Sequence, residues 1–483
     1  MGNSRRVRRS LLALGLLVGL AGCGGGGGGG GSTPTGGRPI ATARGVPQTI
    51  TVRNSPAYRL GGGGDDYLLI LSEPYGAGGT ASVRLNGGTT TLPLLGSRAP
   101  EAGAGRHVPI ATWNNLLAGR LGSEPPTRQL SDPPIGSQRR FTVLTGEDRL
   151  VTATLREKGR HCLLYVDNAT AAGALTAANM ADLRRDFDDH IYPTTTGALG
   201  PTGDVDGNNK VIFLLTPTLP LTGYGYFYPG DLLGANNSAD MLYMTVPRPH
   251  LNLTYERLRS GLLATMAHEL AHLINFNHKK GIGSEESWLN EGLSFVSEQL
   301  NGYLDSVGGS PENVAYYFRS PERYTGRELS GDYLDGHAGV NYLFVRYLAD
   351  RFGEDVLPRL VTSRLRGQEN VRQATGQEYA VLQPQFAAAL YLSGTGLSAD
   401  PRYQLTGFDT RGEYPLVGAK LHGPQQTVLS AASGQPRAAI TWARGGLRYL
   451  RFTRVPAAGA YIQLSTADAT IQATFLRLPA TAP

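Results

Sequence analysis

The sequence predicts an α+β protein, in which a central domain of mixed sheet and helices is flanked by two β-rich domains. Short apolar runs alternate with turn residues between 46 and 155, and again between 399 and 483, which is typical of β-strands. Between 156 and 398, a few strand-like runs give way to long segments with apolar residues three or four apart, which is typical of helices. A chain of 483 residues is long enough for several such domains.

The first 22 residues have the features of a bacterial lipoprotein signal peptide. Four arginines lie among the first ten residues, the apolar run 11–20 follows, and Leu-Ala-Gly-Cys ends the segment at Cys23. The apolar run is too short to span a bilayer as a permanent helix. These last four residues resemble a lipobox, so we expect cleavage before Cys23 and a lipid on its thiol. The protein is therefore expected in the cell envelope, outside the cytoplasm, after export by the Sec or the twin-arginine route.

A glycine-rich tether is predicted at 23–45. Its unbroken glycine run, 24–31, cannot bury apolar surface and behaves as a flexible chain. The formal net charge is +6, but without the four N-terminal arginines 41 basic residues face 39 acidic ones, a net of +2. This balance gives no reason to expect a nucleic-acid partner.

The first β-rich domain is predicted at 46–155, and the strands that begin the central domain follow it. Its strand-like runs are 67–71, 81–85 and 140–144. The central domain is expected to begin with a buried strand at 163–166, a helix at 170–191 that Pro193 ends, and further strands at 211–215 and 241–246.

The turn Asp204-Val205-Asp206-Gly207 precedes the strand at 211–215. It resembles the start of a calcium-binding loop, whose twelfth position is a glutamate ligand. Here the twelfth position is Leu215. We therefore expect a tight turn that initiates the strand, and a Ca²⁺ site is the less favoured alternative.

The central domain is organised around the motif His-Glu-x-x-His at 268–272, within a helical pattern at 254–276. Residues four apart share one face of a helix, so the two imidazoles can converge on one metal ion. A carboxylate from the next helix would complete a three-ligand zinc site with one position open for water. We predict one Zn²⁺ per chain, with His268, His272 and Glu291 as ligands and Glu269 as general base. The alternative is a pair of structural histidines in a helix–helix interface.

Two residues compete as the third ligand. His278 stands six residues after His272, which is the spacing of metzincins, but those enzymes have a methionine turn and no methionine follows Met266. His278 is better explained as a residue at the C-terminal end of its helix. Glu291 lies in Trp-Leu-Asn-Glu-Gly at 288–292, which fits gluzincins, zinc peptidases whose third ligand is a glutamate on a following helix. Zinc aminopeptidases share this run, but their amine-binding Gly-x-Met-Glu-Asn segment is missing upstream.

The runs 265–276 and 288–294 resemble the hyicolysin-like family of secreted gluzincin metallopeptidases. The turn at 204–207, the piece at 225–227 and the helical run 342–348 fit the same resemblance, which covers about residues 160 to 395. The resemblance implies a mixed sheet, an active-site helix and a helical subdomain in the predicted domain 156–398. It implies nothing about the β-rich domains.

One position departs from the better-known thermolysin pattern. The aspartate expected four residues after the third ligand, which orients a histidine, is Phe295 here. We expect Asn290, Ser294 or Glu298 to take over this role.

The C-terminal part of the chain continues with helices and then returns to strands. Helices are predicted at 337–351, 355–362 and 378–392. Strands at 438–442, 447–452 and 460–464 would form the second β-rich domain, 399–483.

These features predict a zinc endopeptidase anchored to the membrane through lipid on Cys23. The zinc ion would lower the pKa of a bound water, and Glu269 would take its proton and pass it to the leaving amine. His337 or Tyr333, near the start of a later helix, is expected to stabilise the oxyanion. The substrates would be proteins or peptides.

Two alternatives remain. One is an aminopeptidase, and the other is a binding or adhesion lipoprotein with a vestigial or structural metal site. A structural site, however, has no use for the general base Glu269.

Overall fold

The computed structural model describes residues 37–482 apart from the gaps 41, 53–55, 75–78, 86–131, 145–147, 221–222, 235, 307–309, 326–334, 432–436, 443–444 and 467–470. The predicted signal peptide, Cys23 and most of the predicted tether lie outside these residues. Among the described residues, no helix is both long enough and apolar enough to cross a membrane.

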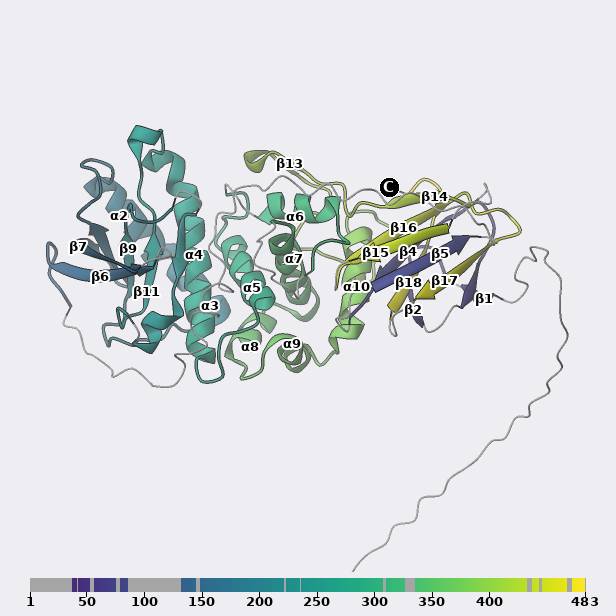
Figure 1. Cartoon of the computed structure of the whole chain (residues 1–483), viewed down its shortest axis with the longest axis horizontal. Coiled ribbons are helices and arrows are strands. Elements are labelled where there is room, and N and C mark those ends of the chain that lie inside the picture. The colour runs from purple at the N-terminus through teal and green to yellow at the C-terminus, as the bar shows by residue number, and fades with distance from the viewer. Residues whose placement is uncertain are drawn as a thin grey trace, which may run out of the picture. The chain divides into compact units, whose positions relative to one another are not determined.

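The fold is α+β, as predicted, and contains a six-stranded sheet, a group of helices and a two-sheet sandwich (Figure 1). The six-stranded sheet has the order β10-β11-β9-β8-β7-β6. Strands β8, β9 and β11 are parallel to one another, whereas β6, β7 and β10 are antiparallel to their neighbours. The bounds are β6 (Gln138–Leu144), β7 (Asp148–Lys158), β8 (Cys162–Asp167), β9 (Val211–Leu215), β10 (Gly225–Phe227) and β11 (Met241–Met244).

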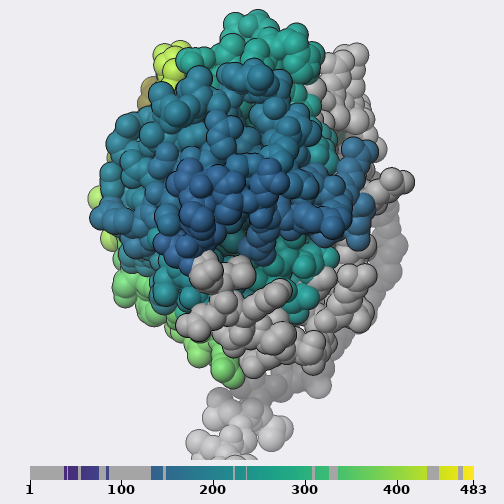
Figure 2. Space-filling view, turned by 90° about the vertical axis from the view of Figure 1, so that its left-hand side faces the viewer, coloured from purple at the N-terminus to yellow at the C-terminus, as the bar shows by residue number. Residues whose placement is uncertain are grey.

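The predicted boundary between 155 and 156 is wrong, because β6 and β7 belong to the six-stranded sheet. Strand β7 pairs with β8 from Ala153 to Lys158, so it extends the sheet of the central domain. Figure 2 views the molecule from the side of β6, and the blue atoms of the chain from β6 to β9 fill the centre of this face.

Both faces of the sheet are covered, which explains why its central strands are continuous apolar runs. Leu164 of β8 and Phe213 of β9 belong to the core shared with the helices. Their neighbours Leu163 and Ile212 point to the opposite face, where they join a second core with Tyr243.

The first helices do not end where the sequence predicts. Helix α2 (Ala177–Asp186) begins after Thr176, whose hydroxyl accepts a hydrogen bond from the N–H of Asn179 at 3.2 Å. The chain then continues through the π-helical turn η1 (Phe187–Ile191) into α3 (Tyr192–Leu199). The prediction that Pro193 ends the helix is wrong because Pro193 lies in the first turn of α3, where a missing N–H removes no intrahelical bond.

Seven further helices follow along the described chain. Their bounds are α4 (Tyr255–Lys279), α5 (Ser287–Leu300), α6 (Ser310–Arg319), α7 (Asp335–Phe352), α8 (Val356–Thr362), α9 (Gly367–Thr375) and α10 (Tyr379–Leu392). Helix α4 lies between the six-stranded sheet and α5 (Figure 1). Helix α7 packs closely on α5 at Gly292, where a Cβ atom would lie 2.5 Å from the carbonyl oxygen of Asn341.

A buried ion pair fixes the connection between α4 and α5. The Nζ atom of Lys279 lies 3.1 Å from Oε2 of Glu285, and both side chains are inaccessible to solvent. Lys279 also donates to the carbonyl oxygens of Ser363 and Leu365, at 2.8 and 2.9 Å. The C-terminal end of α4 is thereby held to the segment that follows α8.

The two β-rich domains predicted at 46–155 and 399–483 are not separate, because strands from both chain regions form one sandwich. Its sheets have the orders β1-β3-β17-β5-β15 and β14-β16-β4-β18-β2. Strand β1 lies within the predicted tether, 23–45, so the tether is shorter than predicted. The bounds are β1 (Arg38–Ile40), β2 (Gln48–Val52), β3 (Ala57–Leu60), β4 (Asp66–Ser72), β5 (Gly79–Leu85), β14 (Thr427–Ser430), β15 (Arg437–Trp442), β16 (Leu447–Thr453), β17 (Ala460–Thr466) and β18 (Ile471–Leu478).

The sandwich also packs on the helices. Along β4, Leu69 and Leu71 join the core between the two sheets, while Leu68 and Ile70 join the helical core. The hydroxyl of Tyr449 on β16 donates to the carbonyl oxygen of Ala387 on α10 at 2.9 Å. Short elements connect β9 to α4 and α10 to β14: η2 (Pro229–Leu233), η3 (Pro249–Leu251), η4 (Pro401–Tyr403), β12 (Glu413–Tyr414), η5 (Pro415–Val417) and β13 (Ala419–Lys420).

Candidate metal centre

Helices α4 and α5 bring the three predicted metal ligands together. The Nε2 atom of His268 lies 3.4 Å from Oε2 of Glu291, and Nε2 of His272 lies 3.6 Å from Oε1 of the same carboxylate. One donor atom from each of the three residues lies within 4.8 Å of the other two. All three side chains are buried.

This donor set fits a zinc ion. Bonds of about 2.1 Å in a tetrahedral site place neighbouring donor atoms about 3.4 Å apart, which agrees with the two nitrogen–oxygen distances. Two imidazoles and one carboxylate are also the donors of hydrolytic zinc sites that keep a fourth position open. The three residues are therefore suited to hold zinc without further rearrangement of the helices.

Hydrogen bonds behind the imidazoles orient both rings. The Nδ1 atom of His268 lies 2.7 Å from Oε1 of Glu298, a carboxylate that accepts the Nδ1–H proton. The Nδ1 atom of His272 lies 2.9 Å from Oγ of Ser294, whose own proton is donated to the carbonyl oxygen of Asn290. In their neutral, metal-binding form both rings therefore carry the proton on Nδ1, and the Nε2 lone pairs face Glu291.

A single face of α5 supplies these contacts. Glu291, Ser294 and Glu298 are spaced by three and four residues, so they lie along one side of the helix, toward α4. Of the three residues expected to replace the missing aspartate, Ser294 and Glu298 bond the histidines through Nδ1. Oδ1 of Asn290 accepts a bond from Asn275 at 2.7 Å, and hydrogen bonding by the Asn290 side chain also acts to raise the pKa of His272. Phe295 packs edge-on against the ring of His268, with centroids 4.9 Å apart.

Charge and burial act differently on the two histidines. Burial lowers the pKa of His268, but the carboxylates of Glu291, Glu298 and Glu269 outweigh it, and the net pKa is raised well above its usual value. Burial dominates at His272 and lowers its pKa. Glu269 is itself buried, and its charge acts on both histidines. The carboxylates thus make this pocket favourable for a cation.

His278 lies in the last turn of α4, away from the metal-binding group. Its Nε2 atom is 3.2 Å from the carbonyl oxygen of Pro201, and it is not among the residues that share the donor cluster. This placement agrees with its interpretation as a residue of the helix end.

Of the two residues predicted to stabilise the oxyanion, the structure describes only His337. His337 is buried in the first turn of α7, where its Nδ1 atom lies 2.6 Å from the carbonyl oxygen of Thr325 and its ring packs edge-on against Tyr324. The N–H of Thr325 also donates to the same Nδ1 atom at 3.2 Å, and in the tautomer in which Nδ1 accepts this bond, Nε2–H is the available donor. Tyr333 lies outside the described residues.

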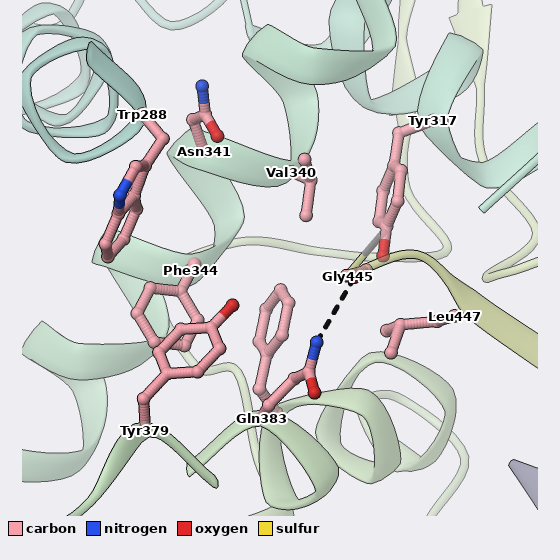
Figure 3. A pocket seen from close by; sticks show the side chains of 10 residues that line it. Trp288, Tyr317, Val340, Asn341, Phe344, Tyr379, Gln383, Gly445 and Leu447 are labelled. Carbon is pink, nitrogen blue, oxygen red and sulfur yellow. Dashed lines mark hydrogen bonds between the residues drawn. The ribbon is translucent and has the colours of Figure 1, made fainter. Parts of the chain in front are cut away.

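A cavity lies where α5, α7 and α10 meet the start of β16 (Figure 3). Gln383 reaches across it and donates from Nε2 to the carbonyl oxygen of Gly445 at 3.2 Å. None of the three predicted metal ligands lines the cavity, which lies at the junction of the helices and the sandwich. The lining residues are Trp288, Tyr317, Val340, Asn341, Phe344, Tyr379, Gln383, Phe386, Gly445 and Leu447.

A second group of side chains that could hold a metal ion contains Asp204, Asp206 and Asp240. The two aspartates of the turn were predicted as a less favoured Ca²⁺ site, but Asp240 was not predicted to join them. The available signal was its position directly before a strand, since parallel neighbours such as β9 and β11 begin at the same edge of the sheet.

The chain was also compared with known proteins. No protein-family model matches it, and no curated protein matches it either. The assignment of a function therefore depends on the residues and geometry of the site.

Proposed function

We propose that this chain is a zinc-dependent endopeptidase of the gluzincin type. It would be anchored in the bacterial cell envelope through lipid on Cys23 and would act outside the cytoplasm on proteins or peptides. The observation that carries the proposal is the convergence of His268, His272 and Glu291 in one buried cluster. The resemblance of the runs 265–276 and 288–294 to hyicolysin-like enzymes supports the same reaction.

The chain's own residues have separate roles in the proposed reaction. A bound zinc ion would supply an activated water and a Lewis acid for the scissile carbonyl. Glu269 accepts the proton of the attacking water and delivers it to the leaving amine. Glu298 and Ser294 are positioning residues, because they hold the imidazoles in the required tautomer. His337 or Tyr333 donates to the developing oxyanion.

The sheet edge beside α4 is suited to bind an extended substrate. Strand β10 ends the sheet among the described strands, since it pairs only with β11 there. A Cβ atom at Gly225 would lie 3.0 Å from Thr265, which is one turn before His268. A peptide paired with β10 through main-chain hydrogen bonds would reach the metal site without a strict sequence requirement.

The test compares wild type, Glu269→Ala and Glu256→Ala. Glu256 is an exposed glutamate on the same helix, so its variant is a matched control. Zinc content is measured by mass spectrometry of the metal, and activity by cleavage of an unfolded protein. We expect one zinc per chain in all three proteins, cleavage by wild type and Glu256→Ala, and a loss of at least about 100-fold in Glu269→Ala.

The product termini decide between endopeptidase and aminopeptidase. Internal cleavage sites support the proposal, whereas stepwise loss of single N-terminal residues supports an aminopeptidase. A zinc-loaded wild type that cleaves neither unfolded proteins nor peptides would contradict any peptidase assignment and would favour the binding lipoprotein.

A further inference from the structure

Three aspartates meet at the edge of the six-stranded sheet. Asp204 and Asp206 lie in the loop that leads into β9, and Asp240 directly precedes β11. The N–H of Ile212 donates to the carbonyl oxygen of Asp240 at 2.8 Å, which joins the beginnings of the two parallel strands. One carboxylate oxygen from each aspartate lies within 4.8 Å of the other two. Residues separated by more than thirty positions therefore form one acidic cluster.

Each carboxylate uses one oxygen to order the loop. The bonds are from Asn209 N to Asp204 Oδ1 at 3.0 Å, from Asn208 Nδ2 to Asp206 Oδ2 at 2.9 Å, and from Val205 N to Asp240 Oδ2 at 2.5 Å. The loop thus holds the carboxylates in place by one oxygen each.

The other oxygens of the two buried aspartates lack a partner. Asp206 is 0% exposed and Asp240 is 1% exposed. Within the described chain, Oδ1 of each has no hydrogen-bond partner, and no Lys, Arg or His nitrogen lies within 4.0 Å of the three carboxylates. Buried carboxylate oxygens without a donor or a counter-ion are strongly unfavourable. A cation bound between the three carboxylates would remove this cost.

The pKa values of the two buried aspartates reflect the same unfavourable burial of charge. Burial raises the pKa of Asp206 to about 7, and the charge of Asp240 adds to the effect. Burial also raises the pKa of Asp240 to about 6. The positive charges of Arg139 and Lys280 offset these shifts only in part.

We infer that Asp204, Asp206 and Asp240 bind one calcium ion. Carboxylates and water are the ligands of hard cations, whereas zinc and copper favour nitrogen or sulfur. Asp204 is accessible to solvent, which leaves room for the water ligands that calcium sites commonly include. The glutamate missing at Leu215 is not needed, because Asp240 supplies a carboxylate from a different segment.

The calcium ion would stabilise the sheet edge near the C-terminal end of α4. The loop that carries Asp204 also packs on this helix, since Pro201 contacts His278 and a Cβ atom at Gly203 would lie 2.4 Å from Asn277. Ordering of the loop therefore holds the start of β11 and the end of α4 together. The ion is structural and takes no part in hydrolysis.

The test uses the full-length protein, freed of divalent cations and reloaded with zinc. Calorimetric titration with calcium chloride alone is expected to show one site with a Kd of roughly 1 mM or tighter. At about 10 mM calcium, the melting temperature is expected to rise by roughly 2 °C or more.

Asp206→Asn and Asp240→Asn are expected to lose both responses. Their melting temperature without calcium should be no lower than that of calcium-free wild type, because the amide removes a buried charge, and this shows that they fold. Asp204→Asn should weaken binding roughly tenfold, because it removes one solvent-accessible ligand charge.

Asp231→Asn is the matched control. Asp231 is also a buried aspartate, but its oxygens accept hydrogen bonds from the hydroxyl of Tyr243 at 2.6 Å and the N–H of Asn237 at 2.9 Å. This variant should keep the calcium response. The inference is overturned if wild type binds no calcium, if Asp206→Asn or Asp240→Asn retains the wild-type affinity, or if Asp231→Asn abolishes binding.

Discussion

The side chains that hydrogen-bond the two histidines determine how the imidazoles of the candidate centre are oriented. His268 and His272 differ in their supporting group, which is the carboxylate of Glu298 for the first and the hydroxyl of Ser294 for the second. Such supporting bonds fix the ring orientation and raise the basicity of the metal-binding nitrogen. The affinity for zinc is therefore expected to depend on residues that do not touch the ion.

Ser294→Ala is expected to weaken zinc binding roughly 10-fold or more, because the imidazole of His272 loses the acceptor for its Nδ1–H. The measurement is zinc affinity by competition with a chromogenic chelator. Ser297→Ala is the matched control, since Ser297 is equally buried on α5 but donates to the carbonyl oxygen of Ala267 at 2.9 Å. Equal zinc affinities in the two variants would contradict this role of Ser294.

For single residues, the sequence predicted the members of the candidate site that share one helix or follow it closely in the chain. The four-residue spacing of His268 and His272 was sufficient to place them on one face. The choice among Asn290, Ser294 and Glu298 needed the rotation of α5 relative to α4, which spacing alone does not determine. Asp240 was missed because its place beside Asp206 arises from strand pairing.

Among the elements, α2 and α4 are held together by a group of charges around Asp182. Its carboxylate accepts hydrogen bonds from Nε of Arg259 at 2.5 Å and from the hydroxyl of Tyr255 at 2.7 Å. The bond from Arg259 is the largest cause that lowers the pKa of Asp182 from 3.8 to about 2. These bonds join α2, which lies between β8 and β9 in the chain, to α4, the helix that carries His268 and His272.

Asp182→Asn is expected to change the pH dependence of stability. A carboxyl with a lower pKa in the folded state stabilises the fold above its unfolded pKa, near 4, and this contribution is lost as the pH falls toward 2. The shift corresponds to about 2 kcal/mol. The variant should therefore lose about 1–2 kcal/mol at neutral pH and show a flatter stability curve between pH 4 and 2 in denaturant titrations.

Asp189→Asn provides the control, since Asp189 also pairs with an arginine, Arg160, but on the exposed surface. Exposed pairs contribute little to stability. If both variants lost the same free energy, the partly buried contact between α2 and α4 would have no special role.

The long helices were predicted within a few residues, because their apolar spacing extends over several turns. Helix α4 was expected at 254–276 and extends over Tyr255–Lys279. The error at Pro193 arose because a proline that ends one helix and a proline that begins the next give the same local signal. Here the intervening π-helical turn keeps the chain helical.

The sandwich joins distant parts of the described chain, because it takes strands from residues 38–85 and from residues 427–478. Strand β4 lies between β16 and β18, and β5 lies between β15 and β17. Alternating apolar residues predicted the individual strands, but they carry no information about which strand is the partner. The two β-rich regions were therefore interpreted as two domains.

Neither β-rich region is expected to fold when expressed alone. A fragment 34–131 lacks the neighbours β15 to β18, and a fragment 399–483 lacks β4 and β5. Both should give poorly dispersed proton NMR spectra, because an unpaired strand leaves its backbone groups and apolar face exposed. A fragment that gave a well-dispersed spectrum and unfolded cooperatively would contradict the shared sandwich.

We propose that one zinc ion is bound between α4 and α5. The most direct measurement is anomalous diffraction at the zinc absorption edge from crystals of the zinc-loaded protein. We expect a single strong peak about 2.1 Å from Nε2 of His268, Nε2 of His272 and a carboxylate oxygen of Glu291, and no peak there in Glu291→Ala. A peak at other residues, or a peak that persists in Glu291→Ala, would show that these three residues do not form the zinc site.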